Sequence, residues 1–248
     1  MVNFQIESWA AMAPGLETRE AWLHWLKHPE SLPDTLGKVL LEKIPPMLRR
    51  RFGTLGKCAM MAALQVLGEN ESIPGVFSSR HGDTTLTLSL LEEMGRDEPM
   101  SPTGFSLAVH NAVSGLFSIA RKDTSMVTSL AAMEGLVLHT LLEAVGQLQV
   151  SDRVLCVIYD IPLPPLYRRD CTASEFPYAI ALIINRQGGV GYAIEQCEQV
   201  IEDDAAVSPD SRFLEPETFK FLELLAGIST QMATDLNGNA WRITKTET

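Results

Sequence analysis

Several motifs and one sign of charge are scarce or missing in this chain of 248 residues, and each absence excludes a kind of function. The sequence has no GxSxG nucleophile elbow, no Walker phosphate-binding loop and no GxGxxG spacing. Basic residues are few: 20 Lys and Arg stand against 31 Asp and Glu, which gives a formal charge of -11. Because this charge offers no positive field to phosphate backbones, we expect no nucleic-acid partner.

Cysteine is also scarce, and long uninterrupted apolar runs are absent. The four cysteines are widely spaced and form no CxxC pair, which is typical of free thiols in a reducing compartment. The most apolar long stretch, 126–148, contains two glutamates and a histidine, so it is too polar to span a bilayer. Residues 1–13 lack the basic start of a secretory signal. We therefore predict a cytoplasmic protein without a membrane span.

The composition is globular, with 46% hydrophobic and 21% charged residues. Hydrophobic patterning predicts alternating helices and strands, followed by two strands that Arg186-Gln187-Gly188-Gly189 joins as a hairpin. The predicted strands are 3–10, 75–79, 123–127, 153–160, 178–185, 190–197 and 241–244. The predicted helices are 18–28, 52–67, 84–94, 102–120, 128–148 and 216–226. This order favours an α/β fold with a layered mixed sheet.

The predicted helix 128–148 is the longest in the chain. Its apolar surface covers more than half of the helical wheel, which is typical of a helix buried between two layers. Glu134 falls inside this apolar arc near the expected helix start, where the macrodipole favours a carboxylate. Pairing with a basic group or water, or a role in a site, would each account for this glutamate.

Two groups of residues have a spacing that suits metal or site chemistry. His24 and His28 lie four residues apart on a predicted helix, but no third ligand is nearby and Trp25 indicates packing, so we predict no metal and no cofactor. The segment 79–83 (Ser-Arg-His-Gly-Asp) gathers polar groups after a buried strand, where α/β folds often place function. We favour a turn there, in which Asp83 or the next residue caps the following helix.

The expected strand-to-helix junction at 128–131 is the segment most similar to a position where enzymes place a nucleophile. A thiol at the start of this helix would have a lowered pKa, because the dipole and the free amides stabilise the thiolate. The sequence there is Thr-Ser-Leu-Ala, without a cysteine. Ser129 would act as a nucleophile only with a base in reach, and no histidine neighbours it in sequence. An N-cap is the simpler interpretation.

The order and spacing of five groups of segments over most of the chain carry a family resemblance. They are Ala13-Pro14-Gly15-Leu16 with Trp22; Gly75-Val76-Phe77-Ser78-Ser79-Arg80-His81-Gly82; Ser101-Pro102-Thr103-Gly104-Phe105-Ser106 with His110-Asn111-Ala112; Thr128-Ser129-Leu130-Ala131-Ala132 with Leu142-Glu143-Ala144; and Val157-Ile158-Tyr159-Asp160. Together they resemble the N-terminal half of a β-ketoacyl synthase, a thiolase-fold enzyme. The pattern is similar to that of short β-ketoacyl-synthase-like proteins from bacterial aryl polyene gene clusters.

The resemblance implies half of a thiolase-like fold with a buried central helix and a C-terminal hairpin. It implies one domain, 1–248, with 200–248 as a C-terminal extension that packs on it. The family's elbow cysteine is absent, and its two catalytic histidines belong to a C-terminal half, so we expect no catalytic residue and no condensing activity. The resemblance then implies a chain-length factor that forms a heterodimer or heterotetramer with a full-length β-ketoacyl synthase and meets acyl carrier protein through that complex.

Three sets of residues are candidates for this role. The degenerate elbow (Thr128, Ser129 and Leu130) and the aromatic residues Phe105 and Phe117 are expected to line or border an acyl or polyene tunnel. The basic run Arg49, Arg50 and Arg51 is a possible carrier-protein contact, although solvated arginines are an alternative. Two other functions stay open. One is a serine-dependent acyltransferase or hydrolase that uses Ser129, and the other is a scaffold that recruits the acidic carrier protein.

Overall fold

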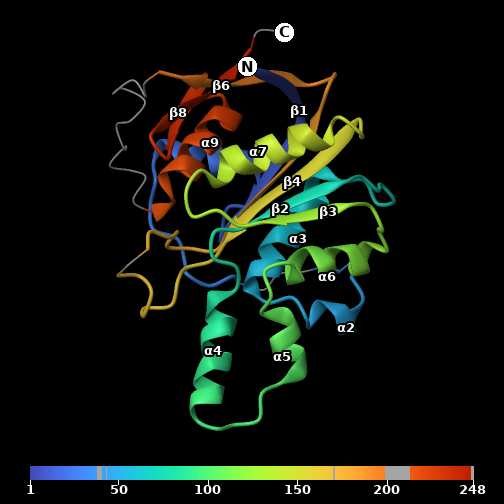
Figure 1. Cartoon of the computed structure of the whole chain (residues 1–248), viewed down its shortest axis with the longest axis vertical. Helices are drawn as coiled ribbons and strands as arrows, with labels where there is room; N and C mark the ends of the chain where they lie inside the picture. The colour runs from blue at the N-terminus through green and yellow to red at the C-terminus, as the bar shows by residue number, and fades with distance from the viewer. Residues whose placement is uncertain (38–40, 43, 170, 199–212, 247–248) are drawn as a thin grey trace.

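The computed structural model describes residues 1–37, 41–42, 44–169, 171–198 and 213–246. One mixed sheet holds its strands in the order β3-β2-β4-β5-β1-β6-β8-β7 (Figure 1). The strands are β1 (Val2–Met12), β2 (Gly75–Ser78), β3 (Val127–Leu130), β4 (Arg153–Asp160), β5 (Tyr178–Asn185), β6 (Val190–Cys197), β7 (Gln231–Leu236) and β8 (Asn239–Lys245). In the described part of the chain, no helix has the length and apolar character needed to cross a membrane.

Helices cover both faces of this sheet and form the outer layers. The helices of the described chain are α1 (Arg19–Lys27), α2 (Pro46–Arg49), α3 (Thr54–Val66), α4 (Thr84–Gly95), α5 (Pro102–Leu107), α6 (Ala112–Arg121), α7 (Leu136–Gln147) and α9 (Pro216–Ala226). Apolar residues of α1, α7 and α9 pack on one face, and those of α3 and α6 pack on the other. This architecture confirms the predicted layered mixed α/β fold.

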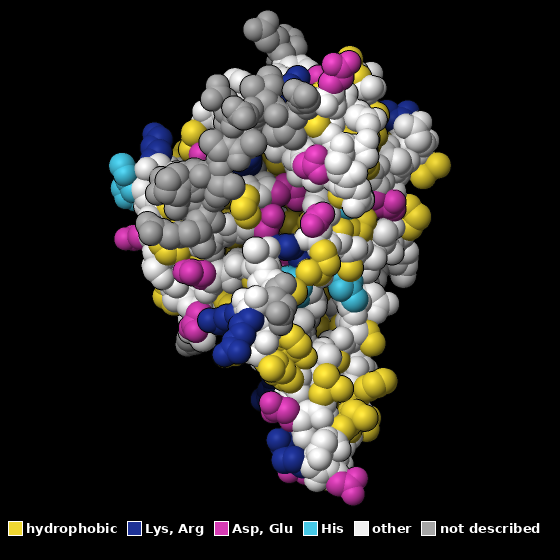
Figure 2. Space-filling view, turned by 60° about the vertical axis from the view of Figure 1, so that its left-hand side comes forward, with side chains coloured by type: hydrophobic (Ala, Val, Ile, Leu, Met, Phe, Trp, Pro, Cys, Tyr) yellow, Lys and Arg dark blue, Asp and Glu magenta, His cyan; other side chains and the backbone are white. Residues whose placement is uncertain are grey.

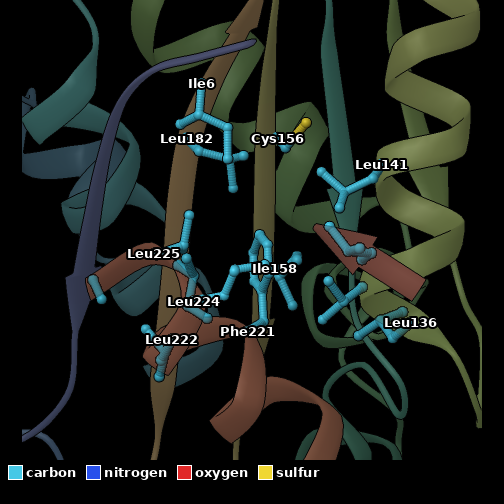
Figure 3. Packing of buried hydrophobic residues seen from close by; sticks show 14 of the residues in the cluster. Ile6, Leu136, Leu141, Cys156, Ile158, Leu182, Phe221, Leu222, Leu224 and Leu225 are labelled. Carbon is cyan, nitrogen blue, oxygen red and sulfur yellow. The ribbon is translucent and has the colours of Figure 1, made fainter. Parts of the chain in front are cut away.

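The central strands are apolar along their whole length because both of their faces are covered. Every residue of β5 is buried, and in β4 only the first residue, Arg153, is partly exposed. Successive residues of β4 point to opposite faces, so Ile158 packs under α7 and α9 while Tyr159 packs with the residues of α3 and α6. Figure 3 shows Phe221 of α9 beside Ile158 of β4, with leucines of α9 on one side of this pair and Leu136 and Leu141 of α7 on the other.

The predicted hairpin of 178–185 and 190–197 is wrong in its pairing, although both strands have the predicted bounds. β1 lies between β5 and β6 and pairs antiparallel with each of them. The turn between the two strands must span this inserted strand, and Gly189 (φ +147°) leaves room where a side chain would meet the backbone of Ile6. The C-terminal hairpin is instead formed by β7 and β8.

The predicted helix 128–148 begins too early, and the strand predicted at 123–127 is displaced. Residues 127–130 form β3, which pairs in parallel with β2, and α7 begins only at Leu136. Gly135 has a left-handed backbone (φ +64°) that a continuous helix cannot include. The predicted burial of this helix is confirmed, since eight residues of α7 are buried, among them Leu138 and Leu141, and the helix packs on β2, β4 and α9.

The single helix predicted at 102–120 is also wrong, because the chain breaks between α5 and α6 at 108–111. α4 and α5 pack against each other and project from the sheet as an arm, which we call the α4–α5 arm (residues 84–107; Figure 1). On the opposite side, α9 packs against α7, and β8 pairs with β6, so the end of the chain extends the same sheet. Residues 200–212 of the expected C-terminal extension lie outside the described residues.

Candidate functional site

The carboxyl ends of the three parallel strands β2, β3 and β4 meet at one edge of the sheet, where α/β folds commonly place their sites. The loop after β2 begins with Ser79, the turn after β3 covers 131–135, and β4 ends at Asp160. α7 starts directly after the turn, so its N-terminus points into the same region. The candidate site is therefore built from segments that are far apart in sequence.

Asp160 is a buried carboxylate that ties the loop after β2 to the end of β4. It accepts hydrogen bonds from the Ser79 hydroxyl (2.8 Å) and from the backbone N–H of Arg80 (3.1 Å) and His81 (3.4 Å). Burial raises the pKa of this carboxyl to about 6, and these hydrogen bonds and the nearby Arg80 charge act in the opposite direction. The bonds leave little of its acceptor capacity for a ligand.

Arg80 holds the turn after β3 in place. Its guanidinium donates to the backbone oxygen of Met133 (2.7 Å from Nη2 and 2.9 Å from Nε) and to the backbone oxygen of Thr172 (3.1 Å). The interpretation of 79–83 as a turn is confirmed: Gly82 has a positive φ of 63°, and Asp83 caps α4 by accepting from the backbone N–H of Leu86 (3.0 Å). These polar groups of the segment are thus hydrogen-bonded within the chain.

The N-terminus of α7 is closed by a carboxylate from α9. Glu217 accepts hydrogen bonds from the backbone N–H of Val137 (3.1 Å) and Leu138 (3.2 Å) and is almost fully buried. Burial raises the pKa of Glu217 to about 7, and the charge of Glu215 adds to this effect. We expected a carboxylate at the helix start, but Glu134 was the wrong residue, because it lies exposed in the turn before the helix.

The predicted elbow residues do not lie at the start of a helix, because Thr128, Ser129 and Leu130 form the edge strand β3. The Ser129 hydroxyl lies 2.8 Å from the Ser114 hydroxyl, and the structure gives it no hydrogen bond to a histidine or a carboxylate among the described residues. The turn that replaces the elbow has the sequence Ala-Ala-Met-Glu-Gly, with no thiol and no hydroxyl. The turn that leads into this helix N-terminus therefore supplies no thiol and no hydroxyl.

The other predicted residues lie apart from this site and from one another. Phe117 is buried in the core of the α3 and α6 face, with its ring 5.0 Å from that of Phe77. Phe105 is 61% exposed on the α4–α5 arm. The run 49–51 begins with the last residue of α2 and continues into the connection to α3, and its second and third residues are exposed. The His24 and His28 rings lie 5.6 Å apart, and the described residues include no set of three His, Cys, Asp or Glu able to hold a metal.

Solved structures of ketosynthases share this fold. The structure "Ketosynthase (ApeO) in Complex with its Chain Length Factor (ApeC)" from Xenorhabdus doucetiae matches with a TM-score of 0.79 at 22% identity, over 98% of this chain and 100% of the other. The ishigamide ketosynthase/chain length factor matches with a TM-score of 0.70 at 11% identity, over 99% of each chain. A β-ketoacyl synthase from Burkholderia phymatum STM815 matches with a TM-score of 0.66 at 8% identity over both whole chains.

The sequence itself gives the family. No curated protein sequence matches this chain, but the family model described as "Beta-ketoacyl synthase, N-terminal domain" matches residues 22–243. That range contains the strands β2 to β7 and all the helices from α3 to α9, so the match covers the candidate site completely. The chain belongs to the β-ketoacyl synthase N-terminal domain family.

Proposed function

We propose that this chain is a non-catalytic subunit of the chain-length-factor type, which pairs with a full-length β-ketoacyl-ACP synthase. One observation carries the proposal. The helix N-terminus that would activate an elbow cysteine is occupied by the chain's own Glu217, and the adjoining turn offers no thiol or hydroxyl. In this proposal the partner supplies the cysteine and both histidines.

The physical reason is electrostatic. Free amides and the positive end of a helix dipole lower the pKa of a thiol and stabilise negative charge. Here the amides of Val137 and Leu138 already donate to the Glu217 carboxylate. A second negative charge at that point would be repelled by Glu217 and would lack donors. The arrangement supports a site in which this helix N-terminus binds a capping carboxylate and does not activate a nucleophile.

The sheet edge at β3 supports pairing with a second protein. Among the described strands β3 pairs only with β2, so its other edge presents backbone groups that another chain can extend or cover. Met126 and Met133, which flank β3 in sequence, are 51% and 48% exposed. Apolar side chains at an open strand edge favour burial against a partner.

The α4–α5 arm supplies a second apolar surface. Leu91 and Met94 of α4 are 51% and 56% exposed, and Phe105 of α5 is 61% exposed. Figure 2 shows hydrophobic side chains gathered along this arm. A projecting arm with large apolar side chains gains stability when a partner removes them from water. We place Phe105 and the β3 residues 128–130 at or near the partner, where they would border the tunnel that receives the growing chain.

The named assemblies of the similar structures are consistent with this role. Two of them are ketosynthase and chain length factor pairs, and a third match, "AntDE:AntF (apo)", is described as a type II PKS acyl-carrier protein in complex with its ketosynthase. We therefore propose aryl polyene or related fatty-acid-like synthesis in the cytoplasm, on an acyl carrier protein that meets the complex partly through Arg49, Arg50 and Arg51. The chain needs no cofactor for this role.

Reconstitution of condensing activity tests the proposal. The chain is mixed with the full-length ketosynthase of its own genome, and elongation of a carrier-bound acyl group is measured. We expect activity from the pair, none from this chain alone, complete loss when the partner's elbow cysteine is replaced by alanine, and no loss with Ser129→Ala here. Burst acylation of the isolated chain by an activated thioester, abolished by Ser129→Ala, would instead establish the serine-dependent enzyme.

A further inference from the structure

An open cleft of about 730 Å³ borders the loops that follow β2 and β4, but neither Asp160, Arg80 nor the start of α7 lines it. One wall comes from the residues before and at the start of α3, and the other from the proline-rich loop that follows β4. α4 closes one side with Thr85, Leu86 and Ser89. The volume falls in the range of about 300–1,000 Å³ that is typical of small-molecule sites.

Three arginines converge on this cleft from two segments: Arg50 and Arg51 from the α3 side, and Arg168 from the loop after β4. None of the ion pairs that the structure shows among its described residues involves any of the three. Arg168 donates from Nε to the backbone oxygen of Leu163 (2.7 Å), which fixes the guanidinium and leaves both terminal nitrogens for a ligand. Arginine is the side chain best suited to bind a carboxylate or a phosphate.

Two aspartates also line the cleft, and neither cancels this charge. Asp83 already accepts the capping hydrogen bond from the backbone N–H of Leu86, and burial raises the pKa of its carboxyl, which disfavours the charged form. Asp34 is exposed. Three arginines against these two carboxylates leave an excess of positive charge, in a chain whose formal charge is -11.

The remaining surface of the cleft is largely apolar. Leu86, Leu107, Ile161 and Leu163 contribute aliphatic side chains, and four prolines from the same loop region line it with them. We infer that the cleft binds an amphiphile with one oxyanion head, a carboxylate or a phosphate, and an apolar chain. The arginines would hold the head and the aliphatic wall would cover the chain. Arg50 and Arg51 also belong to the carrier-protein contact of the proposed function, but this ligand site is a separate proposal and needs no partner subunit.

Calorimetric titration of the full chain tests this inference with probes of matched length. The probes are octanoate and octyl phosphate, both kept below their micelle concentrations, with octanol and inorganic phosphate as controls. We expect saturable binding of at least one amphiphile and at least tenfold weaker binding of octanol and of phosphate alone. Whichever of the two amphiphiles binds more tightly identifies the head group as carboxylate or phosphate.

Neighbouring arginines provide matched control variants. Arg51→Ala and Arg168→Ala should each raise the Kd of the amphiphile about tenfold or more, since each removes a charge-assisted hydrogen bond. Arg49→Ala and Arg169→Ala remove the same charge from residues that do not line the cleft, so the Kd should stay within about twofold. General attraction of anions would respond to all four variants alike.

A variant that fills the cleft tests the contribution of its space to binding without changing its charge. Thr85 is an exposed residue of α4 that lines the cleft, so Thr85→Trp should fill the space, abolish binding and leave the circular dichroism spectrum unchanged. The inference is overturned if neither amphiphile binds saturably, if inorganic phosphate binds as tightly as octyl phosphate, or if the lining and control arginine variants have equal effects.

Discussion

The Glu217 carboxylate lies 3.1 Å from the backbone nitrogen of Val137, so a residue of α9 closes the first turn of the central helix α7. A second hydrogen bond, to the backbone N–H of Leu138, measures 3.2 Å. These donors are buried, so without Glu217 they would have neither water nor another acceptor. The contact joins the C-terminal part of the chain to the candidate site and also removes the donors that a catalytic thiolate would need.

Replacement of Glu217 tests how much this contact stabilises the fold. Glu217→Ala leaves two buried N–H groups without an acceptor, and each such group costs roughly 1–3 kcal/mol. We expect the free energy of unfolding at pH 6, measured by urea denaturation, to fall by about 3 kcal/mol. Glu217→Gln keeps an acceptor oxygen and should cost less.

Glu223 provides the matched control on the same helix. It is only partly exposed, and no backbone N–H is seen to donate to its side chain among the described residues. Glu223→Ala should change the free energy of unfolding by less than about 1 kcal/mol. Equal losses for the two alanine variants would show that Glu217 acts only through general packing of α9.

The pH dependence of stability follows from two buried carboxyls. Burial raises the pKa of Glu217 to about 7 and that of Asp160 to about 6, both above their ordinary values of 4.5 and 3.8. The folded state therefore binds these protons more tightly than the unfolded chain does. This contribution is fully present below about pH 4 and is lost as the pH rises through about 6 and 7.

We expect urea midpoints of the native chain to fall between pH 4 and pH 7.5 through this effect, and Glu217→Gln to remove its own share of the fall. That share is roughly 3 kcal/mol, because one pKa unit corresponds to about 1.4 kcal/mol. Other titrating groups are common to both proteins and cancel in the difference. Parallel stability curves for the native chain and Glu217→Gln would contradict the raised pKa of Glu217.

Asp160 should be a second strong polar determinant of stability at the site. Asp160→Ala removes the acceptor of the Ser79 hydroxyl and of the Arg80 N–H, and should lower the free energy of unfolding by about 3 kcal/mol. Ser79→Ala should cost less, and the double variant should cost less than the sum, because the two side chains share one hydrogen bond. The exposed Asp152, replaced by alanine, is the control, and urea denaturation is the measurement.

Local sequence patterns predicted those strands and helices that their own residues mark. The bounds of β4, β5, β6 and α9 match the prediction because β-branched runs and a proline at a helix start mark them directly. The pairing of β5 with β6 was wrong because β1, more than 160 residues away, competes for the same edges. The missed strand β7 had a signal, since Asn237-Gly238 is a typical hairpin turn and both residues have positive φ.

The candidate site was only partly predictable. The missing cysteine could be read from the sequence, but apolar residues at 128–135 fit both a helix and a strand, so the helix start was placed too early. A carboxylate near that start was expected from the macrodipole. The residue that caps the helix, however, is Glu217, which lies 80 positions along the chain from the amide that it accepts from. Local periodicity contains no information on such a distant contact.

The two phenylalanines proposed for the tunnel should differ in their effects. Phe117→Ala removes a buried ring that packs on Phe77 and should lower the free energy of unfolding by about 4 kcal/mol. Phe105→Ala changes an exposed residue and should leave the stability within about 0.5 kcal/mol. In the reconstituted complex, however, Phe105→Ala should lengthen the products measured by mass spectrometry.

Leu166, which is 63% exposed on the loop after β4, is the matched control for Phe105. Leu166→Ala should change neither stability nor product length. Unaltered product length with Phe105→Ala, in a complex that remains intact, would count against a tunnel role for this residue.

The most direct test of the central claim is the molar mass of this chain co-expressed with the full-length ketosynthase of its genome, measured by size-exclusion light scattering. We expect a stable one-to-one or two-to-two complex. Met126→Lys should weaken the complex because it places a charge beside the open β3 edge, whereas Val150→Lys, at an 82% exposed position after α7, should not. A soluble monomer that forms no complex with the ketosynthase would contradict the account.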